Sequence, residues 1–217
     1  MKRALIVRGG WDGHEPVQTA DLIAESLRKN QFEVEIADTL DAFKDVERLM
    51  TFDVLMPHWT MGAIAKEPLN GLLEAVKSGV GVGGIHGGMG DAFREACGFQ
   101  WMVGGQFVSH PGNSAPTYTV NIVDRRHPIT KGIEDFQATS EQYYMHVDPS
   151  NQVLATTTFE AERVPGGRDV VMPVTWIRMY HRGRVFYTSV GHNAAVVKMP
   201  PVLTMITRGL MWAAGVL

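Results

Sequence analysis

The chain has 217 residues, of which 45% are hydrophobic, and a formal net charge of -3 with both signs interspersed along the sequence. This is enough to bury a sizeable core, and no Ser/Pro-rich or highly charged stretch divides the chain, so we predict a single domain over residues 1–217. The charge balance excludes a strongly basic nucleic-acid-binding surface, and no run of about 18 apolar residues is present to span a membrane.

The amino-terminal segment and the cysteine content predict a cytoplasmic location. Met1, Lys2 and Arg3 are followed by only four apolar residues, which are too few for a signal peptide. Cys97 is the one cysteine, so no internal disulfide can form. The sequence leaves the oligomeric state open, a homo-oligomer included.

Strands and helices alternate in the first half of the chain. Short apolar runs that end in glycine are typical of buried parallel strands, and short connections between alternating elements predict right-handed crossovers in a parallel sheet. The predicted elements are strands at 4–8, 32–37 and 52–59, helices from Pro16 and at 68–79, and a strand, Gly-rich turn and helix within 80–93.

The second half of the chain is less regular. Its predicted elements are strands at 117–123 and 153–159, a hairpin of strands 171–180 and 183–192, and a terminal helix from Pro200 or Pro201 to about Ala214. The whole pattern predicts an α/β fold of flavodoxin-like type, with a doubly wound, mostly parallel sheet in a three-layer α/β/α arrangement. In such sheets ligands bind beyond the carboxyl ends of the strands.

The segment Gly84-Ile85-His86-Gly87-Gly88 has the glycine spacing of a nucleophile elbow. Such a turn between strand and helix exposes its central side chain at the end of the sheet. Histidine at this position suits metal binding or acid–base catalysis. The alternative is a Gly-rich turn with an incidental histidine.

Three further histidines are expected at the same edge of the sheet. His14 follows the first strand, His110 lies in an irregular segment after the elbow, and His192 ends the last strand. Because the carboxyl ends of parallel strands share one edge, these imidazoles and His86 form a candidate metal site. The alternative is that each one separately caps a strand end.

A carboxylate and several aromatic residues are candidates for the rest of the site. Glu141 lies in a polar and aromatic loop, where it is either a catalytic base or a solvated acid. Tyr143 and Tyr144 beside it, together with Trp11 and Trp59, are candidate sugar-binding surfaces, although core packing explains the tryptophans as well.

Other catalytic signals are weak or missing. Cys97 is expected on the helix after the elbow, where we predict a small buried hydrophobic side chain rather than a nucleophile. No phosphate-binding loop and no dinucleotide-binding glycine pattern follows the first strand, so no nucleotide cofactor is expected.

An ordered set of motifs resembles the trehalose-utilisation (ThuA-like) family, which has the class I glutamine amidotransferase-like fold. The set spans nearly the whole chain and comprises GGWDGHE, GIHGG, GGQFVSHP, RRHPITKG, SEQYY, GRVFYTSVGH and RGLMWAAG. Amidotransferases of this fold have cysteine at the elbow and a late histidine–glutamate pair. Here the elbow holds His86, and no glutamate follows His192 by two positions, so glutamine hydrolysis is not expected.

The resemblance implies disaccharide catabolism together with a sugar oxidoreductase. A 3-keto glycoside is the expected substrate: Glu141 would abstract the C2 proton, and a Zn²⁺, Mn²⁺ or Fe²⁺ ion would polarise the ketone. Two alternatives stay open. One is a non-catalytic sugar-binding or regulatory module, and the other is a metal-free isomerase that uses His86 and Glu141 as acid and base.

Overall fold

The structure is a computed structural model and describes residues 1–113 and 116–217. The strands are β1 (Lys2–Gly10), β2 (Phe32–Ala37), β3 (Val54–Thr60), β4 (Gly81–Ile85), β5 (Gly105–Ser109), β6 (Thr117–Ile122), β7 (Phe136–Thr139), β8 (Tyr144–Val147), β9 (Gln152–Phe159), β10 (Val170–Tyr180) and β11 (Gly183–Thr188). The helices are α1 (Pro16–Lys29), α2 (Val46–Leu49), α3 (Lys66–Lys77), α4 (His86–Gly90), α5 (Cys97–Val103), α6 (Ala194–Val197) and α7 (Pro200–Ala213). Short 3-10 turns are η1 (Asp12–His14), η2 (Leu40–Phe43) and η3 (Ala161–Arg163).

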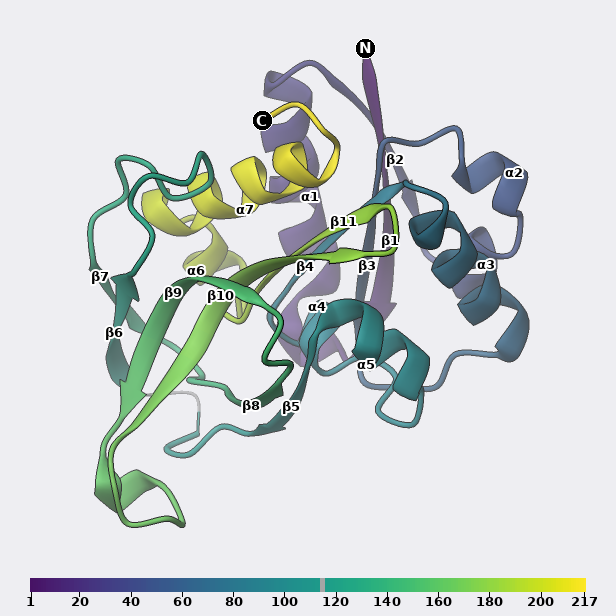
Figure 1. Cartoon of the computed structure of the whole chain (residues 1–217). Helices are drawn as coiled ribbons and strands as arrows, with labels where there is room; N and C mark the ends of the chain where they lie inside the picture. Colours follow the sequence, from purple (N-terminus) through teal and green to yellow (C-terminus); the bar gives the residue numbers. More distant parts are fainter. Residues whose placement is uncertain (114–115) are drawn as a thin grey trace.

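Within the described residues, nine strands form one mixed sheet in the order β2-β1-β3-β4-β11-β10-β9-β6-β7, and β5 pairs with β8 separately (Figure 1). The strands from β2 to β11 are mutually parallel, which confirms the predicted doubly wound α/β fold. From β11 to β7 the pairing is antiparallel. The irregular second half of the sequence therefore extends the parallel sheet with hairpins, which need no crossover helix.

Helices cover both faces of the parallel half (Figure 1). Along β1, the side chains of Ala4 and Ile6 belong to the core cluster that includes α1 and α7. Leu5 and Val7 belong to the opposite cluster, which includes α3 and α5. Alternate side chains of a parallel strand thus enter two separate apolar cores, which produces the predicted three layers.

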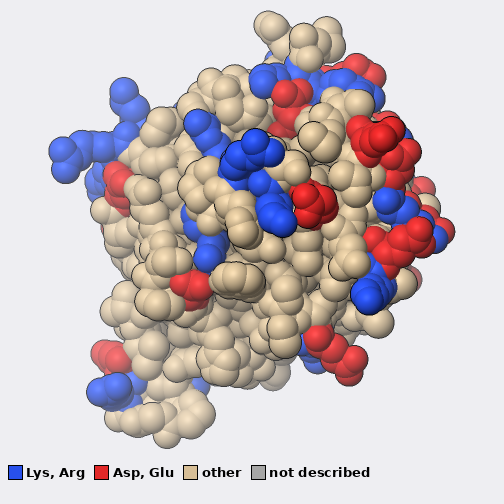
Figure 2. Space-filling view, turned by 45° about the vertical axis from the view of Figure 1, so that its right-hand side comes forward, with Lys and Arg blue, Asp and Glu red and all other residues tan. Residues whose placement is uncertain are grey.

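No helix in the described part of the chain is long and apolar enough to cross a membrane. On the face shown in Figure 2, lysine and arginine lie among aspartate and glutamate rather than in one broad basic area.

The elbow between β4 and α4 holds a strained histidine. His86 has φ 45°, a left-handed conformation that non-glycine residues rarely adopt. The hydroxyl of Tyr187 on β11 donates to the carbonyl oxygen of His86 over 2.9 Å and helps to hold the turn. The next turn of α4 packs closely on β3, because a Cβ on Gly88 would overlap with Nδ1 of the buried His58.

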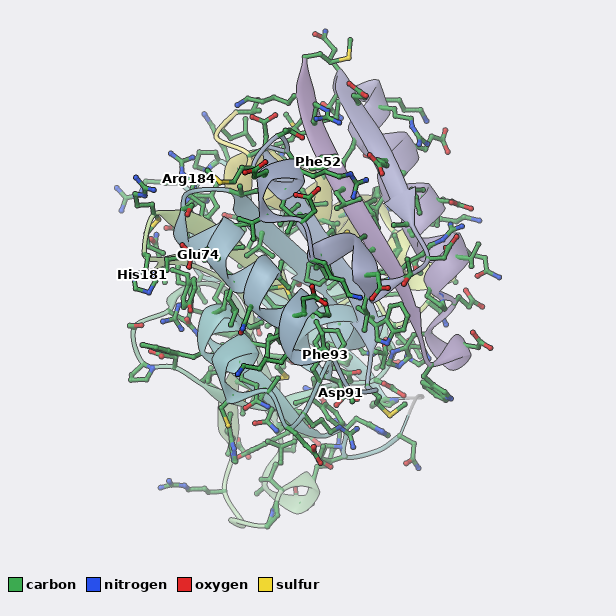
Figure 3. The ribbon with its side chains drawn as sticks, turned by 90° about the vertical axis from the view of Figure 1, so that its right-hand side faces the viewer. Phe52, Glu74, Asp91, Phe93, His181 and Arg184 are labelled. Carbon is green, nitrogen blue, oxygen red and sulfur yellow. The ribbon has the colours of Figure 1, made fainter. Side chains whose placement is uncertain are left out.

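The predicted burial of Cys97 and its predicted place on the elbow helix are wrong. Cys97 is exposed and begins α5 instead of continuing the elbow helix. The elbow helix ends at Gly90, and the chain then turns through Phe93 with φ 48°. Arg94 donates to both carboxylate oxygens of the buried Asp91, over 2.6 and 2.9 Å, which stabilises this turn. Asp91 and Phe93 lie together at the end of the sheet opposite Phe52 (Figure 3).

We predict that Gly88→Ala destabilises the protein. The new methyl group has to displace the His58 ring, and overpacking of this kind costs about 1–3 kcal/mol, of which better helix propensity recovers up to about 1 kcal/mol. Urea unfolding should show a lower free energy of unfolding. Gly166→Ala is the matched control, because no atom lies within 4 Å of its added Cβ. Equal stability of the two variants would contradict the tight contact between α4 and β3.

Candidate functional site

Four polar side chains from separate segments meet at the carboxyl end of the parallel strands. His14 lies in η1 after β1, His86 is at the elbow after β4, and His192 lies in the loop after β11. Glu141 comes from the loop between β7 and β8. One potential ligand atom from each of the four lies within 4.8 Å of the others. We call these residues the His/Glu cluster.

The carboxylate oxygen Oε2 of Glu141 is the centre of the cluster. It lies 3.0 Å from Nε2 of His86, 3.4 Å from Nδ1 of His192 and 3.6 Å from Nε2 of His14. The side chains are 2% exposed for His86 and 14% exposed for His192. The cluster therefore approaches the surface on the side of His192.

Two of the imidazoles are oriented by a partner on their other nitrogen. Nδ1–H of His86 donates to the carbonyl oxygen of Ser189 over 2.7 Å. Nδ1 of His14 lies 3.0 Å from the hydroxyl of Thr60, at the end of β3. In metal sites, the nitrogen that does not bind the ion is usually held in this way, which fixes the ring and its tautomer.

The protonation of the cluster follows from its burial. Burial lowers the pKa of His86 to about 4, although hydrogen bonding to Glu141 opposes this shift. Burial alone would raise the pKa of Glu141, but hydrogen bonding to His14, His192 and His86 outweighs it and holds that pKa well below its usual value. At neutral pH the cluster therefore combines a neutral His86 with an ionised Glu141.

Several polar atoms meet around Nε2 of His86 at the centre of the cluster. Nδ1–H of His86 donates to Ser189, and Nε2 of the same ring lies 3.0 Å from Oε2 of Glu141 and 3.3 Å from Nδ1 of His192. A proton on Nε2 of His86 or on Nδ1 of His192, or a cation between these atoms, would satisfy the contacts. Three imidazole nitrogens and one carboxylate oxygen could hold a divalent transition-metal ion.

Glu141 is held in place by buried polar contacts of the antiparallel half. It is 7% exposed, which excludes the solvated loop acid considered from the sequence. The Tyr118 hydroxyl donates to the Glu141 carbonyl oxygen over 3.2 Å. The neighbouring Gln142 side chain donates to the Thr157 hydroxyl over 2.8 Å and accepts from Arg163 over 2.8 Å. The loop is thus fixed on both sides of the carboxylate.

His110, the fourth histidine predicted for the metal site, does not join the cluster. Its ring stacks on Phe107 with the centroids 5.8 Å apart. It follows β5, which pairs only with β8 in the described residues, so the shared edge of the parallel strands does not determine its position. Its Nδ1 is buried and has no hydrogen-bond partner among these residues.

The aromatic residues predicted to bind sugar have different environments. Trp11 is 48% exposed, and its ring meets His14 edge-on at 4.8 Å. Tyr143 is buried and stacks on His86 with the ring centroids 3.9 Å apart, so it packs against one face of the elbow histidine.

The other two aromatic residues pack against their neighbours. The Trp59 ring covers Gly9, leaving no room there for a Cβ. Tyr144 meets Phe159 edge-on at 5.5 Å. Trp11 is therefore the candidate with an open surface beside the cluster.

His58 is a buried residue near the site that our sequence interpretation left without a role. Its Nε2 lies 2.7 Å from the Thr19 hydroxyl, and its ring fills the space beneath α4. Burial, with smaller contributions from the charges of His14 and His86, lowers its pKa to about 3. The sequence did contain a signal for His58, because it lies near the end of the predicted strand 52–59. Histidines at strand ends were the reason for selecting His14 and His192.

Two cavities lie outside the cluster. One, of about 770 Å³, is lined mainly by α3 and the segment around α2. The other, of about 640 Å³, lies between the segment that follows β3 and the turn that follows α4. Neither is lined by a residue of the His/Glu cluster.

Known structures share this fold over almost its whole length. A protein from Parabacteroides merdae, described as ThuA-like, superposes with a TM-score of 0.79 at 19% identity, covering 98% of this chain and 90% of that one. A cytoplasmic protein from Salmonella typhimurium superposes with a TM-score of 0.67 at 14% identity, covering 98% of this chain and 99% of that one. A protein from Thermoplasma acidophilum, described as a GMP synthase subunit, superposes with a TM-score of 0.55 at 15% identity, covering 99% of this chain and 94% of that one. No curated protein sequence matches the chain.

The α/β sheet and its elbow define a protein with the class I glutamine amidotransferase-like fold, in which histidine occupies the tip of the elbow. Within this class, the chain belongs to the ThuA family, described as trehalose utilisation, which matches residues 3–213. Membership of this family indicates a role in sugar metabolism.

The buried His58 gives a testable pH dependence. Its folded-state pKa of about 3 lies below the unfolded value of about 6.5, so the unfolded state binds more protons between these values. As the pH is lowered below 6.5, the free energy of unfolding should therefore decrease by up to about 1.4 kcal/mol per pH unit. His58→Gln should reduce this slope by up to that amount in urea unfolding at pH 6.5 and 4.5. His146→Gln, at an exposed imidazole of β8, is the control, and an unchanged slope in His58→Gln would contradict the prediction.

Proposed function

We propose that the chain acts in sugar catabolism on an oxidised (3-keto) glycoside or disaccharide, by metal-assisted proton abstraction followed by elimination and hydration. The observation that carries this proposal is the His/Glu cluster, whose ligand atoms lie within 4.8 Å of one another. The family description supports a sugar as substrate. Exposed Trp11 beside the cluster supports it too, because an indole face packs well against the C–H groups of a pyranose.

The donor set fits a divalent ion such as Zn²⁺, Mn²⁺ or Fe²⁺. His14, His86 and His192 would bind it as neutral imidazoles, and Glu141 would supply one negative charge. A divalent ion in this set leaves a net charge of about +1. That charge matches an uncharged substrate on which one negative charge develops during the reaction. When bound, the ion would polarise the C3 ketone.

Glu141 is the proposed base. A ketone at C3 acidifies the proton at C2, and the carboxylate takes that proton. The electron pair of the C2–H bond then forms the C1–C2 double bond while the C1–O bond breaks. The leaving oxygen takes a proton, and addition of water across the double bond completes a net hydrolysis. Since Oε2 faces the three imidazoles, Oε1 is the oxygen left to accept the substrate proton.

We propose that the chain does not hydrolyse glutamine. A thioester route requires a cysteine at the tip of the elbow, where this chain has His86. The one cysteine, Cys97, is exposed at the start of α5 and is not part of the cluster. We also propose a cytoplasmic location, in keeping with this free thiol and with the Salmonella typhimurium protein described as cytoplasmic.

We predict one divalent ion per chain. Protein loaded with Zn²⁺, Mn²⁺ or Fe²⁺ and freed of excess ion by gel filtration should contain close to one equivalent by mass spectrometry. His192→Ala should weaken binding about tenfold or more, since it removes one of four ligands. His146→Gln, at an exposed imidazole outside the cluster, should keep full loading. Absence of stoichiometric metal in the wild type would remove the metal from the mechanism.

We predict turnover of 3-keto-trehalose and none of trehalose, because trehalose lacks the ketone that acidifies C2. Glu141→Gln should lower kcat at least 100-fold, because it removes both the proposed base and the one anionic ligand of the proposed ion. Cys97→Ala should keep wild-type activity, because the thiol is exposed outside the cluster. Unchanged rates in both Glu141→Gln and His86→Ala would rule out this site. Full turnover by metal-free protein, lost in both variants, would instead favour the acid–base pair of His86 and Glu141.

A further inference from the structure

Glu15, which directly follows the cluster residue His14, has an unusual backbone conformation. Its φ is 48°, in the left-handed region that favours glycine. Its carbonyl oxygen accepts from the amide of Thr19 over 2.9 Å and from the Thr19 hydroxyl over 2.7 Å. The start of α1 thus fixes the main chain of Glu15 despite its strained conformation.

The side chain of Glu15 reaches a different loop. Its Oε2 accepts from the amide of Ala194 over 2.9 Å. Ala194 is the first residue of α6 and follows His192 by two positions. Within residues 1–113 and 116–217, this is the only hydrogen bond that joins residues 11–15 to residues 189–195.

The position of the His192 loop is critical for the cluster. His192 offers Nδ1, which is the ring nitrogen nearer to the main chain, so its backbone has to lie close to the other ligands. The loop also contains Gly191 with φ 142°. The rings of His14 and His192 meet edge-on with their centroids 5.0 Å apart. A small movement of the loop would therefore remove Nδ1 of His192 from the cluster.

We infer that Glu15 is a positioning residue that clamps the His192 loop onto the His14 loop and so completes the fourth corner of the cluster. The inference rests on the proposed metal site for its effect on affinity, but the clamp itself is a property of the protein alone. Glu15 acts through the Ala194 amide and contacts neither metal nor substrate.

A double-mutant cycle in metal affinity tests the clamp. Zn²⁺ dissociation constants are measured by chelator competition for the wild type, Glu15→Ala, His192→Ala and the double variant. Glu15→Ala should weaken affinity about 10- to 100-fold, as loss of a supporting contact does at other metal sites. It should have no further effect in the His192→Ala background. Equal losses in both backgrounds, or no loss in either, would overturn the inference.

Matched variants separate the clamp from general destabilisation. Glu15→Gln keeps an acceptor oxygen at the same reach and should bind Zn²⁺ within about threefold of the wild type. Glu15→Asn tolerates the left-handed backbone but is one methylene shorter, so it should behave like Glu15→Ala even if that variant folds poorly. Asp45→Ala removes a carboxylate that accepts from the Arg48 amide at the start of α2, far along the chain from the cluster, and should leave affinity unchanged.

A metal-free measurement distinguishes failure of the clamp from failure of the proposed function. If the wild type binds no Zn²⁺, the metal proposal fails, and the clamp is judged by nuclear magnetic resonance. Glu15→Ala should speed hydrogen exchange of the Ala194 amide and weaken the cross-relaxation between the ring protons of His14 and His192. Unchanged exchange and unchanged ring contacts would overturn the clamp as well.

Discussion

The contact between His86 and Glu141 joins the two halves of the molecule. His86 is held at the elbow of the parallel half, and Glu141 is held by Tyr118 and Gln142 of the antiparallel half. Nε2 of His86 and Oε2 of Glu141 lie 3.0 Å apart in a buried space. A proton or a cation at this point would satisfy the polar atoms that meet there.

The parallel half of this arrangement could be predicted from the sequence. Glycine-ended apolar runs identified the strands, and parallel strands place their carboxyl ends at one edge. His14, His86 and His192 each follow such a strand, so their convergence follows from topology alone. The acidic partner was selected from its loop composition, but its burial depends on antiparallel pairing that the pattern did not reveal. His110 was misplaced for the same reason, since it follows a strand outside the main sheet.

Local details of side-chain packing could not be predicted from the sequence. The elbow helix was expected to continue through Cys97, yet it ends at Gly90, where Asp91 and Arg94 pair and the chain turns. Nothing in the residue pattern distinguishes a helix of five residues from one of twelve, His86 to Cys97, when glycines dominate its start. The role of His58 depends on the absence of a Cβ at a glycine thirty residues later, which is a tertiary relation and has no local signal.

The glycines of the elbow have a consequence for how proteins of this fold diverge. Gly87 packs against His14, Gly88 against His58 and Gly90 against Tyr187, so each of these positions is closed to larger residues. The side chain at the tip, His86, points away from these contacts and toward Glu141. An exchange of thiol for imidazole there alters the reactive group without rebuilding the backbone around it. A substitution at the tip therefore changes the group that faces Glu141 while the packing of the three glycines stays the same.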